Sequence, residues 1–186
     1  GLFENVYFNM ASNDAGNALG AALYVKNKLK PDGERRAQYL TPYLGPSFEE
    51  EDLAPLLERY RLDYTEESDI TKTAAGLIAD GKVVGWFQGR GEYGPRSLGN
   101  RSIIADPRYM RSKLRINQIL KRRDWFMPYA PAILAEHLDE WVKIPTDSPY
   151  MQIALMVREE RQHQIPAAVH MDGLRECRLC AGRITN

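Results

Sequence analysis

The first part of the chain shows both hydrophobic periods that predict secondary structure. Residues 3–10 alternate apolar and polar side chains and include aromatics and Val, so they predict a short strand. Residues 12–29 carry small and apolar side chains at helical spacing, and Ser12 or Asn13 can cap that helix. The side chains expected on its buried face are Ala21, Ala22, Leu23 and Val25.

Residues 28–50 have no clear period and contain several turn-forming residues. These are Pro31, Gly33, Pro42, Gly45 and Pro46. This composition predicts a linker or a wrapping arm. A helix is expected over 47–61, with Ser47 as its cap and three glutamates close to the positive end of the helix dipole.

From residue 71 onward, helical and strand patterns alternate. Residues 71–82 predict a helix that Gly81 ends, and residues 109–126 predict a second helix. The residues expected on one side of the second helix are Met110, Leu114, Ile116 or Asn117, and Leu120. Strands, the first of them buried, are expected over 82–89, 101–106, 130–136, 151–158 and 167–173. The alternation predicts a sheet domain of the α/β or α+β class.

Composition limits the size, partners and location of the protein. With 186 residues, 44% of them hydrophobic, the chain suits one globular domain or one domain plus a fragment. Because 25 Lys and Arg balance 25 Asp and Glu, anion binding must come from local clusters of charge. No apolar run reaches the roughly 18 residues of a membrane span. The start lacks a secretory signal and two cysteines fit a reducing compartment, so a cytoplasmic protein without a membrane partner is expected.

The segment 89–108 combines bendable backbone with fixed positive charge. Its glycines let an anion approach the backbone closely, and successive N–H groups in such turns form anion-binding concavities. Its arginines, which offer planar donors for phosphate or carboxylate, are Arg90, Arg96, Arg101 and Arg108. Only Glu92 and Asp106 oppose them. The segment predicts a phosphate site, and the alternative is a surface turn with weak ion pairs.

A second basic set lies over 108–123. Its members expected to face solvent from the helix are Arg111, Lys113 and Arg115. Lys121 and Arg123 lie at the predicted helix end, two residues apart. They can share one anion only if the chain leaves helical geometry there. The alternative is that they are simply favourable partners of the negative end of the helix dipole.

Several of these segments together resemble one protein family. The matching stretches are "GWFQGRGEYGPRSLGNRSIIADPR", "INQILKRRDWFMPYAPAIL", "SPYM" and "IPAAVHMDG". In order and spacing, over about 51–173, they resemble the C-terminal domain of the nodulation-protein-U carbamoyltransferases. That family includes the tobramycin and cephamycin O-carbamoyltransferases. The upstream stretch "SNDAGNALGAAL" is similar to the end of the family's N-terminal, actin-like domain.

The resemblance implies a domain plan. Residues 1–27 would end the actin-like domain, residues 28–50 would be a linker, and residues 51–173 would form the C-terminal domain. That domain is expected to have a YrdC-like fold, a twisted open mixed sheet with flanking helices and a positively charged cavity. After Gly173 the sequence departs from the family pattern, and we hypothesise that 174–186 is a frame-shifted tail. Missing strands would leave sheet edges open, which predicts association, for example as a homo-oligomer.

The resemblance also implies the chemistry. The family's C-terminal domain makes carbamoyl-adenylate from carbamoyl phosphate and ATP and releases pyrophosphate, and Mg²⁺ is expected with the ATP. The actin-like domain, which holds iron and nucleotide, passes the carbamoyl group to a small-molecule hydroxyl. The chain is therefore expected to be part of an O-carbamoyltransferase. The alternative is a YrdC-like RNA- or nucleotide-binding module without catalysis. The neutral charge and the few aromatics beside the basic helix make nucleic acid an unexpected partner.

The candidate site residues match the family's motifs. The GPR-x-LGNRS motif contains Arg96, Asn100, Arg101 and Ser102, and the K-x-R element contains Lys121 and Arg123. The residues expected to be catalytic, by holding phosphoryl or carbamoyl oxygens, are Arg96, Arg101, Lys121 and Arg123. The residues expected to bind substrate or ATP are Arg90, Asn100, Ser102 and His170.

Three further positions matter for the comparison with the family. His170 matches a histidine near the nucleotide cavity, and the alternative is that it braces a strand. Asp14 matches an iron-ligating aspartate of the full-length enzyme, whose histidine partners would lie upstream, so this chain is not expected to hold that iron. Taken alone, Asp14 is interpreted as a helix cap or first-turn acid. Met127 stands where the family usually has arginine, which removes one anion contact.

Overall fold

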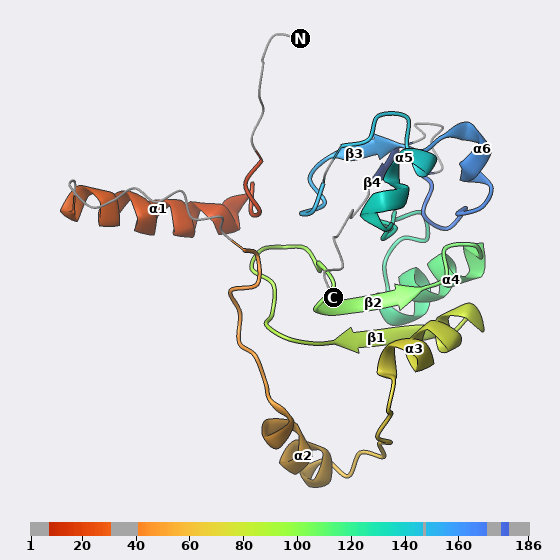
Figure 1. Ribbon diagram of the computed structural model, residues 1–186, viewed down its shortest axis with the longest axis horizontal. Coiled ribbons are helices and arrows are strands. Elements are labelled where there is room, and N and C mark those ends of the chain that lie inside the picture. Colours follow the sequence, from red (N-terminus) through yellow and green to blue (C-terminus); the bar gives the residue numbers. More distant parts are fainter. Residues whose placement is uncertain (1–7, 31–40, 147, 171–175, 179–186) are drawn as a thin grey trace.

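The computed structural model describes residues 8–30, 41–146, 148–170 and 176–178, which form helices beside two small sheets (Figure 1). The helices are α1 (Asp14–Leu29), α2 (Glu50–Arg59), α3 (Ile70–Ala79), α4 (Met110–Leu114), α5 (Leu138–Trp141) and α6 (Glu159–Gln162). A π-helical turn, η1 (Arg115–Leu120), and a 3₁₀ turn, η2 (Ala135–His137), extend this set. The strands are β1 (Val83–Phe87), β2 (Arg101–Ala105), β3 (Ala154–Met156) and β4 (Glu176–Arg178). The predicted mixture of helices and strands is confirmed.

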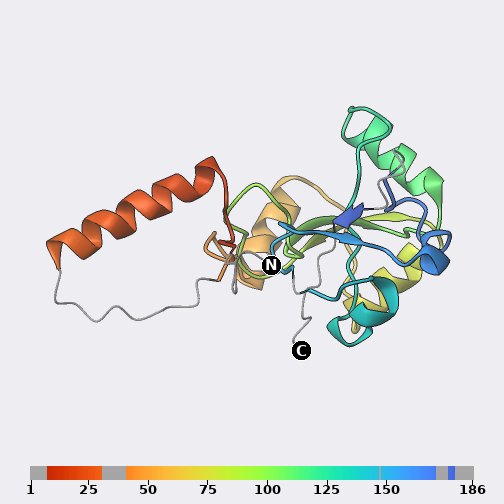
Figure 2. The ribbon, with the colours of Figure 1, turned by 90° about the horizontal axis from the view of Figure 1, so that it is seen from above.

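Helix α1 projects away from the rest of the described chain (Figure 1 and Figure 2). Asn13 caps it as predicted, because the side-chain Oδ1 of Asn13 accepts from the backbone N–H of Ala15 at 3.0 Å. The buried face predicted for this helix is wrong. Its four expected members, all exposed, are Ala21, Ala22, Leu23 and Val25. Helical periodicity identifies a face that suits burial, but it does not supply the partner that covers it.

The ends of α2 and α3 show how local signals succeed or fail. The predicted Ser47 cap of α2 is wrong, because Glu49 is the N-cap and forms a capping box with Asp52. In that box the Asp52 carboxylate accepts from the backbone N–H of Glu49 at 3.0 Å. Helix α3 ends at Ala79 with Asp80 as its C-cap, and the predicted stop residue Gly81 follows directly with a φ of +78°. Glycine adopts this left-handed conformation without the strain that a Cβ would introduce.

Strands β1 and β2 form an antiparallel pair that carries the glycine-rich loop between them. The register runs from Val83 opposite Ala105 to Phe87 opposite Arg101. Helix α3 contacts β1. The prediction that the first strand is buried is wrong, because Gly85 and Phe87 are exposed and the remaining residues of the strand are half-buried. One face of this two-stranded sheet is therefore open.

The helix predicted over 109–126 is shorter and changes type. It continues from α4 into η1 and ends at Leu120, where an i to i+5 hydrogen bond of 2.8 Å joins the N–H of Lys121 to the carbonyl of Ile116. Because a π turn holds more residues than an α turn, it shifts the buried face along the sequence. The residues that it and α4 bury are Ser112, Lys113, Ile116 and Asn117. Lys113 was expected to face solvent and Leu120 to share the packed side, and both predictions are wrong. Arg111 and Arg115 are exposed as predicted.

The apolar core of the described residues lies around α5 and β3. Leu138, Val142 and Leu155 form one buried cluster, and Val157 and Ile165 belong to a second. A bridge between Val142 and Val157 joins the two clusters, and the Trp141 ring packs against both. This core positions the segment that leads from η1 to the end of the described chain.

Several predicted strands are shorter than expected or absent. Residues 130–136 form no strand, and residues 151–158 do so only over Ala154–Met156. Residues 167–170 lie in a turn region and residues 8–10 also lack strand geometry, while residues 3–7 and 171–173 lie outside the described residues. Short apolar runs with prolines nearby fit extended packing segments as well as they fit strands.

Strand β4 belongs to the segment that was predicted to be a frame-shifted tail. It pairs antiparallel with β3, so that Cys177 lies opposite Leu155. Among the described residues, every helix is too short or too polar to cross a membrane.

Candidate functional site

Arg101 begins β2 and binds backbone carbonyls of its own surroundings. Its terminal nitrogens donate, at 2.5 to 3.4 Å, to the carbonyls of Pro46, Gln88, Gly89 and Asn100. The guanidinium carbon also lies 3.6 Å from the centroid of the ring of Phe87, its cross-strand partner. Both terminal nitrogens of Arg101 are therefore engaged by the protein, and they fix the start of the glycine-rich loop.

Arg90 ties residues 41–46 to the same loop. Its guanidinium donates to two carbonyls of that segment at 3.1 and 3.3 Å. Backbone hydrogen bonds also join Gly91 to Gly45 at 2.8 Å and to Pro46 at 3.0 Å. The described end of the expected linker is thus attached to the loop, and the hydrogen bonds of Arg90 are part of this attachment.

Glu92 is the acidic centre of the loop. A single carboxylate oxygen of Glu92 accepts, at 2.8, 2.7 and 3.1 Å, from the backbone N–H groups of Leu98, Asn100 and Arg101. Burial opposes the charge of Glu92, but the backbone donors outweigh it and hold the pKa of Glu92 below its ordinary value. The glycine-rich backbone therefore forms the anion-binding concavity that its sequence predicts, and the anion inside it is the protein's own carboxylate.

The remaining polar groups of the motif complete this internal network. Gly99 has a φ of +113°, and its N–H donates to the hydroxyl of Ser102 at 3.1 Å. The Ser102 hydroxyl is also 2.9 Å from that of Ser97. The side-chain amide of Asn100 donates to the carbonyl of Arg90 at 2.7 Å. Asn100 and Ser102, both expected to bind substrate or ATP, thus hold the loop in shape.

A second polar centre lies where η1 ends. Asn117 is fully buried, and its amide donates to the carbonyls of Trp125 and Met127 at 2.9 and 3.0 Å. Its Oδ1 accepts from Nε of Arg123 at 2.8 Å and from the hydroxyl of Tyr129 at 2.5 Å. One side chain therefore satisfies four groups and folds residues 121–129 back against the helix.

Arg123 is held by one edge of its guanidinium. Nε is bound to Asn117, and the guanidinium carbon lies 4.8 Å from the centroid of the Tyr129 ring. Burial raises the pKa of Tyr129, against the opposing effect of Arg123, so this hydroxyl stays protonated and donates. No hydrogen bond within the described residues engages Nη1 or Nη2 of Arg123. The side chain is therefore oriented by the hydrogen bond of Nε, and its two terminal nitrogens can donate to a ligand.

Lys121 directly follows the π turn. The helix ends at Leu120, and Arg122 has a φ of +46°, so the chain leaves helical geometry between Lys121 and Arg123. This is the condition under which the two cations can share one anion. Lys121 is exposed. By contrast Arg108 pairs with the buried carboxylate of Asp106 at 2.6 Å, and its hydrogen bond to that carboxylate lowers the pKa of Asp106.

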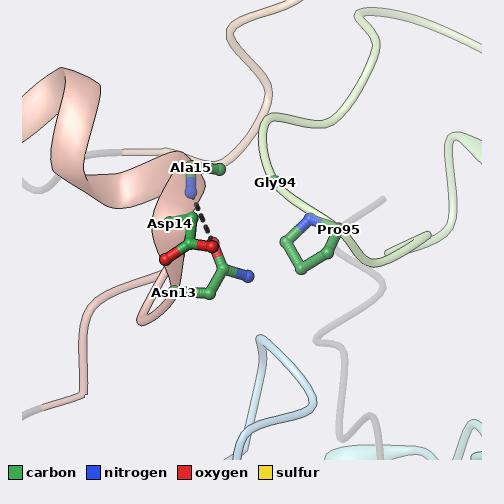
Figure 3. Close-up of a pocket in the computed structure, with 5 residues that line it drawn as sticks. All are labelled: Asn13, Asp14, Ala15, Gly94 and Pro95. Atoms are coloured by element: carbon green, nitrogen blue, oxygen red, sulfur yellow. Dashed lines mark hydrogen bonds between the residues drawn. The ribbon is translucent and has the colours of Figure 1, made fainter.

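A hollow of about 440 Å³ separates the first turn of α1 from the tip of the glycine-rich loop (Figure 3). The residues that line it are Asn13, Asp14, Ala15, Gly94 and Pro95. The Tyr93 hydroxyl donates to the carbonyl of Ala15 and so joins the two walls. Asp14 is a first-turn acid, as one interpretation of the sequence expected.

Arg96 directly follows Pro95, which lines this hollow, and Arg96 is exposed. It differs from Arg90 and Arg101, because in the described parts of the chain no hydrogen bond or ion pair engages its guanidinium. His170 is half-buried beyond the turn at 166–169. No hydrogen bond or ion pair between described residues joins the loop to Lys121 or Arg123. These predicted residues therefore form two groups, one on the glycine-rich loop and one at the helix end.

A family model for the carbamoyltransferase C-terminus matches residues 75–180, more than half of the chain. The chain belongs to this family. The match covers the glycine-rich loop and the helix end around Asn117, so the predicted resemblance is confirmed.

Three relatives illustrate how the chain compares with longer proteins. It is 42% identical over 183 residues to nodulation protein NolNO of Sinorhizobium fredii, covering 93% of this chain and 26% of that protein. It is 41% identical over 180 residues to nodulation protein NolO of Bradyrhizobium diazoefficiens, covering 93% and 32%. It is 33% identical over 173 residues to the 3′-hydroxymethylcephem-O-carbamoyltransferase of Amycolatopsis lactamdurans, covering 93% and 31%. The chain thus spans about a quarter to a third of the length of these relatives.

Glu92 and Asn117 organise the two groups, and neither was among the predicted site residues. Glu92 had a signal in the sequence, because it is the acid closest to the arginines of the loop. Asn117 had a weaker one, as a polar residue at a position that also fits the packed side of a helix. Residue type alone does not reveal that each satisfies three or four partners.

Proposed function

We propose that this chain is the C-terminal part of an O-carbamoyltransferase and that its family domain has a YrdC-like fold. The observation that carries the proposal is the family match over 75–180, because it includes both cationic regions. A relative that aligns with 93% of this chain is named an O-carbamoyltransferase of a cephem. In the whole protein, the carbamoyl group would pass to the hydroxyl of a small molecule.

The proposed reaction of this domain forms carbamoyl-adenylate. An oxygen of the carbamoyl group attacks the α-phosphorus of ATP, and the bond from that phosphorus to the bridging oxygen breaks, so that pyrophosphate leaves. The attacking oxygen is a carboxylate oxygen of carbamate, which forms when one water breaks the bond between the carbamoyl group and the phosphate of carbamoyl phosphate, so that inorganic phosphate leaves. Such a reaction brings two polyanions together and therefore needs several fixed cationic donors.

We assign the direct contacts to the cations whose donors the fold leaves available. Arg123 is oriented through Nε and presents two terminal nitrogens, Lys121 is exposed beside it, and Arg96 is exposed at the loop tip. Each charge-assisted hydrogen bond contributes about 1.5–3 kcal/mol, so three such contacts together contribute roughly 4.5–9 kcal/mol, which corresponds to millimolar to micromolar affinity before the costs of association. Arg90, Asn100, Arg101 and Ser102 would act by shaping the loop. His170 remains a proposed contact of the nucleotide.

The metal ions implied by the family enter this proposal in different ways. Mg²⁺ would come with ATP, held by phosphate oxygens and neutralising their charge. Asp14 fits an iron site only as one oxygen ligand, because its carboxylate is exposed on α1. Within the described residues no three His, Cys, Asp or Glu side chains gather around a common point. Further iron ligands would have to come from the rest of the whole protein.

Calorimetric titration of the chain with a non-hydrolysable ATP analogue, in the presence of carbamoyl phosphate, tests the proposal. We expect saturable binding that Arg123→Gln and Arg96→Gln each weaken. Arg122→Gln, which removes a neighbouring exposed arginine, is the matched control and should bind like the parent chain. Equal heats for the parent, Arg96→Gln and Arg123→Gln would reject the assigned site. Salt-sensitive binding to RNA without any response to carbamoyl phosphate would favour the nucleic-acid module instead.

A further inference from the structure

The backbone donors at the end of the glycine-rich loop are all engaged inside the protein. The N–H groups of Leu98, Asn100 and Arg101 point to one oxygen of Glu92, and that of Gly99 points to Ser102. Four consecutive N–H groups therefore have internal acceptors. Such a run of N–H groups is the backbone arrangement that binds phosphate in other proteins.

We infer that Glu92 is the resident anion of this loop and a positioning residue for Arg96, so that substrate phosphate does not bind the backbone concavity. The hydrogen bonds that the N–H groups of Leu98, Asn100 and Arg101 donate to Glu92 close a ring of chain whose tip carries Arg96. Arg101, held by four carbonyls, fixes the other side of the same ring. Glu92 touches neither ATP nor carbamoyl phosphate in this arrangement, and it acts through the loop.

The arrangement divides anion recognition between backbone and side chains. A carboxylate in the concavity repels a phosphate that approaches the same donors. A polyanion is therefore left with the guanidinium and ammonium groups of side chains. The exposed guanidinium of Arg96 meets this requirement, whereas Arg101 does not, because its terminal nitrogens are engaged.

Chemical rescue tests the inference on the intact chain. Glu92→Ala empties the concavity, and we expect its thermal unfolding temperature to fall by about 3–6 °C, the shift expected for the loss of a few hydrogen bonds in a domain of this size. Formate added at constant ionic strength should raise that temperature saturably, because it replaces the missing carboxylate. The parent chain and Glu66→Ala, which removes an exposed glutamate, should show no such response. A Glu92→Ala protein that is as stable as the parent would overturn the inference.

Amide NMR spectra of the parent chain provide the second test. Addition of inorganic phosphate or pyrophosphate should leave the amide signals of Leu98, Asn100 and Arg101 in place. Saturable shifts of these three signals would show that the concavity admits the ligand, and the inference would fail. If Glu92→Ala does not fold, Glu92→Gln keeps an acceptor oxygen without the charge. Its three amide signals should then move upfield relative to the parent, and unchanged signals would count against a bound carboxylate.

The positioning of Arg96 rests on the proposed function, and its test is separate. The affinity of Glu92→Ala for the ATP analogue should fall about tenfold, the loss of roughly one oriented contact, and formate should restore it. If formate restores the stability of Glu92→Ala but not its affinity for the analogue, Glu92 is still the resident anion of the loop, but it does not act through Arg96. If the parent chain does not bind the analogue at all, the proposed function fails while the rescue of stability still stands.

Discussion

The glycine-rich loop and the helix end around Asn117 use arginine in opposite ways. In the loop, the terminal nitrogens of Arg101 donate to four backbone carbonyls of the protein. At the helix end, the Arg123 guanidinium makes its hydrogen bond to the described residues through Nε, and its position is set by a buried amide and an aromatic ring. In the loop, the arginine charge is used to hold the backbone in place. At the helix end, the backbone and Asn117 hold the arginine so that its charge is available to a ligand.

This difference shows that arginines clustered in a sequence can be of two kinds, those that hold the backbone and those that are held for a ligand. A guanidinium has five N–H donors, and a loop rich in carbonyls can engage them without any ligand. Whether an arginine is structural or can bind a ligand depends on which of its guanidinium nitrogens have no acceptor within the protein. Removing each organising residue and each cation in turn tests whether the two regions differ in this way.

Asn117→Ala is expected to have the largest effect. It deprives two backbone carbonyls of their donor and frees Arg123 and Tyr129, so the free energy of unfolding should fall by about 3–4 kcal/mol. Urea unfolding followed by circular dichroism measures this loss. Gln118→Ala, at the exposed neighbouring position, should change stability by less than about 0.5 kcal/mol. A stable Asn117→Ala protein would mean that the helix end does not depend on this amide.

Arg101→Lys should come next and should act on stability before binding. A lysine cannot reach four carbonyls with a single ammonium group, so the free energy of unfolding should fall by about 2 kcal/mol. Arg96→Lys, the matched change at the loop tip, should leave stability within about 0.5 kcal/mol of the parent. If Arg101→Lys instead kept its stability and lost affinity for the ATP analogue, Arg101 would belong with the ligand-facing cations.

The sequence predicts the elements of this site better than it predicts their contacts. The cap at Asn13, the stop at Gly81 and the strands before and after the loop follow from residue types acting within a few positions of one another. The burial of Lys113 and the exposure of Leu120 depend on the π turn, which no local propensity signals. The internal role of Arg101 depends on Pro46, which is 55 residues away in the chain. Long-range partners of this kind are absent from patterns along a single sequence.

Arg123→Lys should weaken binding with little loss of stability. Lysine keeps the positive charge but offers no second edge of donors, so affinity for the ATP analogue should fall about tenfold, the equivalent of one charge-assisted hydrogen bond. Calorimetric titration measures the change, and Arg122→Lys is the control for charge at the same turn. The comparison between the two regions would collapse if Arg123→Lys destabilised the chain as much as Arg101→Lys does while binding normally.

The smallest effect concerns pH and the carboxylate of Glu92. Its pKa is lower in the folded chain than in the unfolded chain, so its stabilisation is present in full above the ordinary pKa of about 4.3 and is lost as pH falls through the folded pKa. Because Glu92 is only partly buried, its share should stay below about 1 kcal/mol. The stability difference between the parent and Glu92→Gln should therefore be constant near neutral pH and shrink in this acidic range. Asp106→Asn is a useful comparison, because the pKa of Asp106 is lowered mainly by Arg108 and so has a cause outside the loop. A difference between parent and Glu92→Gln that persists unchanged at the lowest pH would show that the charge of Glu92 is not what the backbone donors bind.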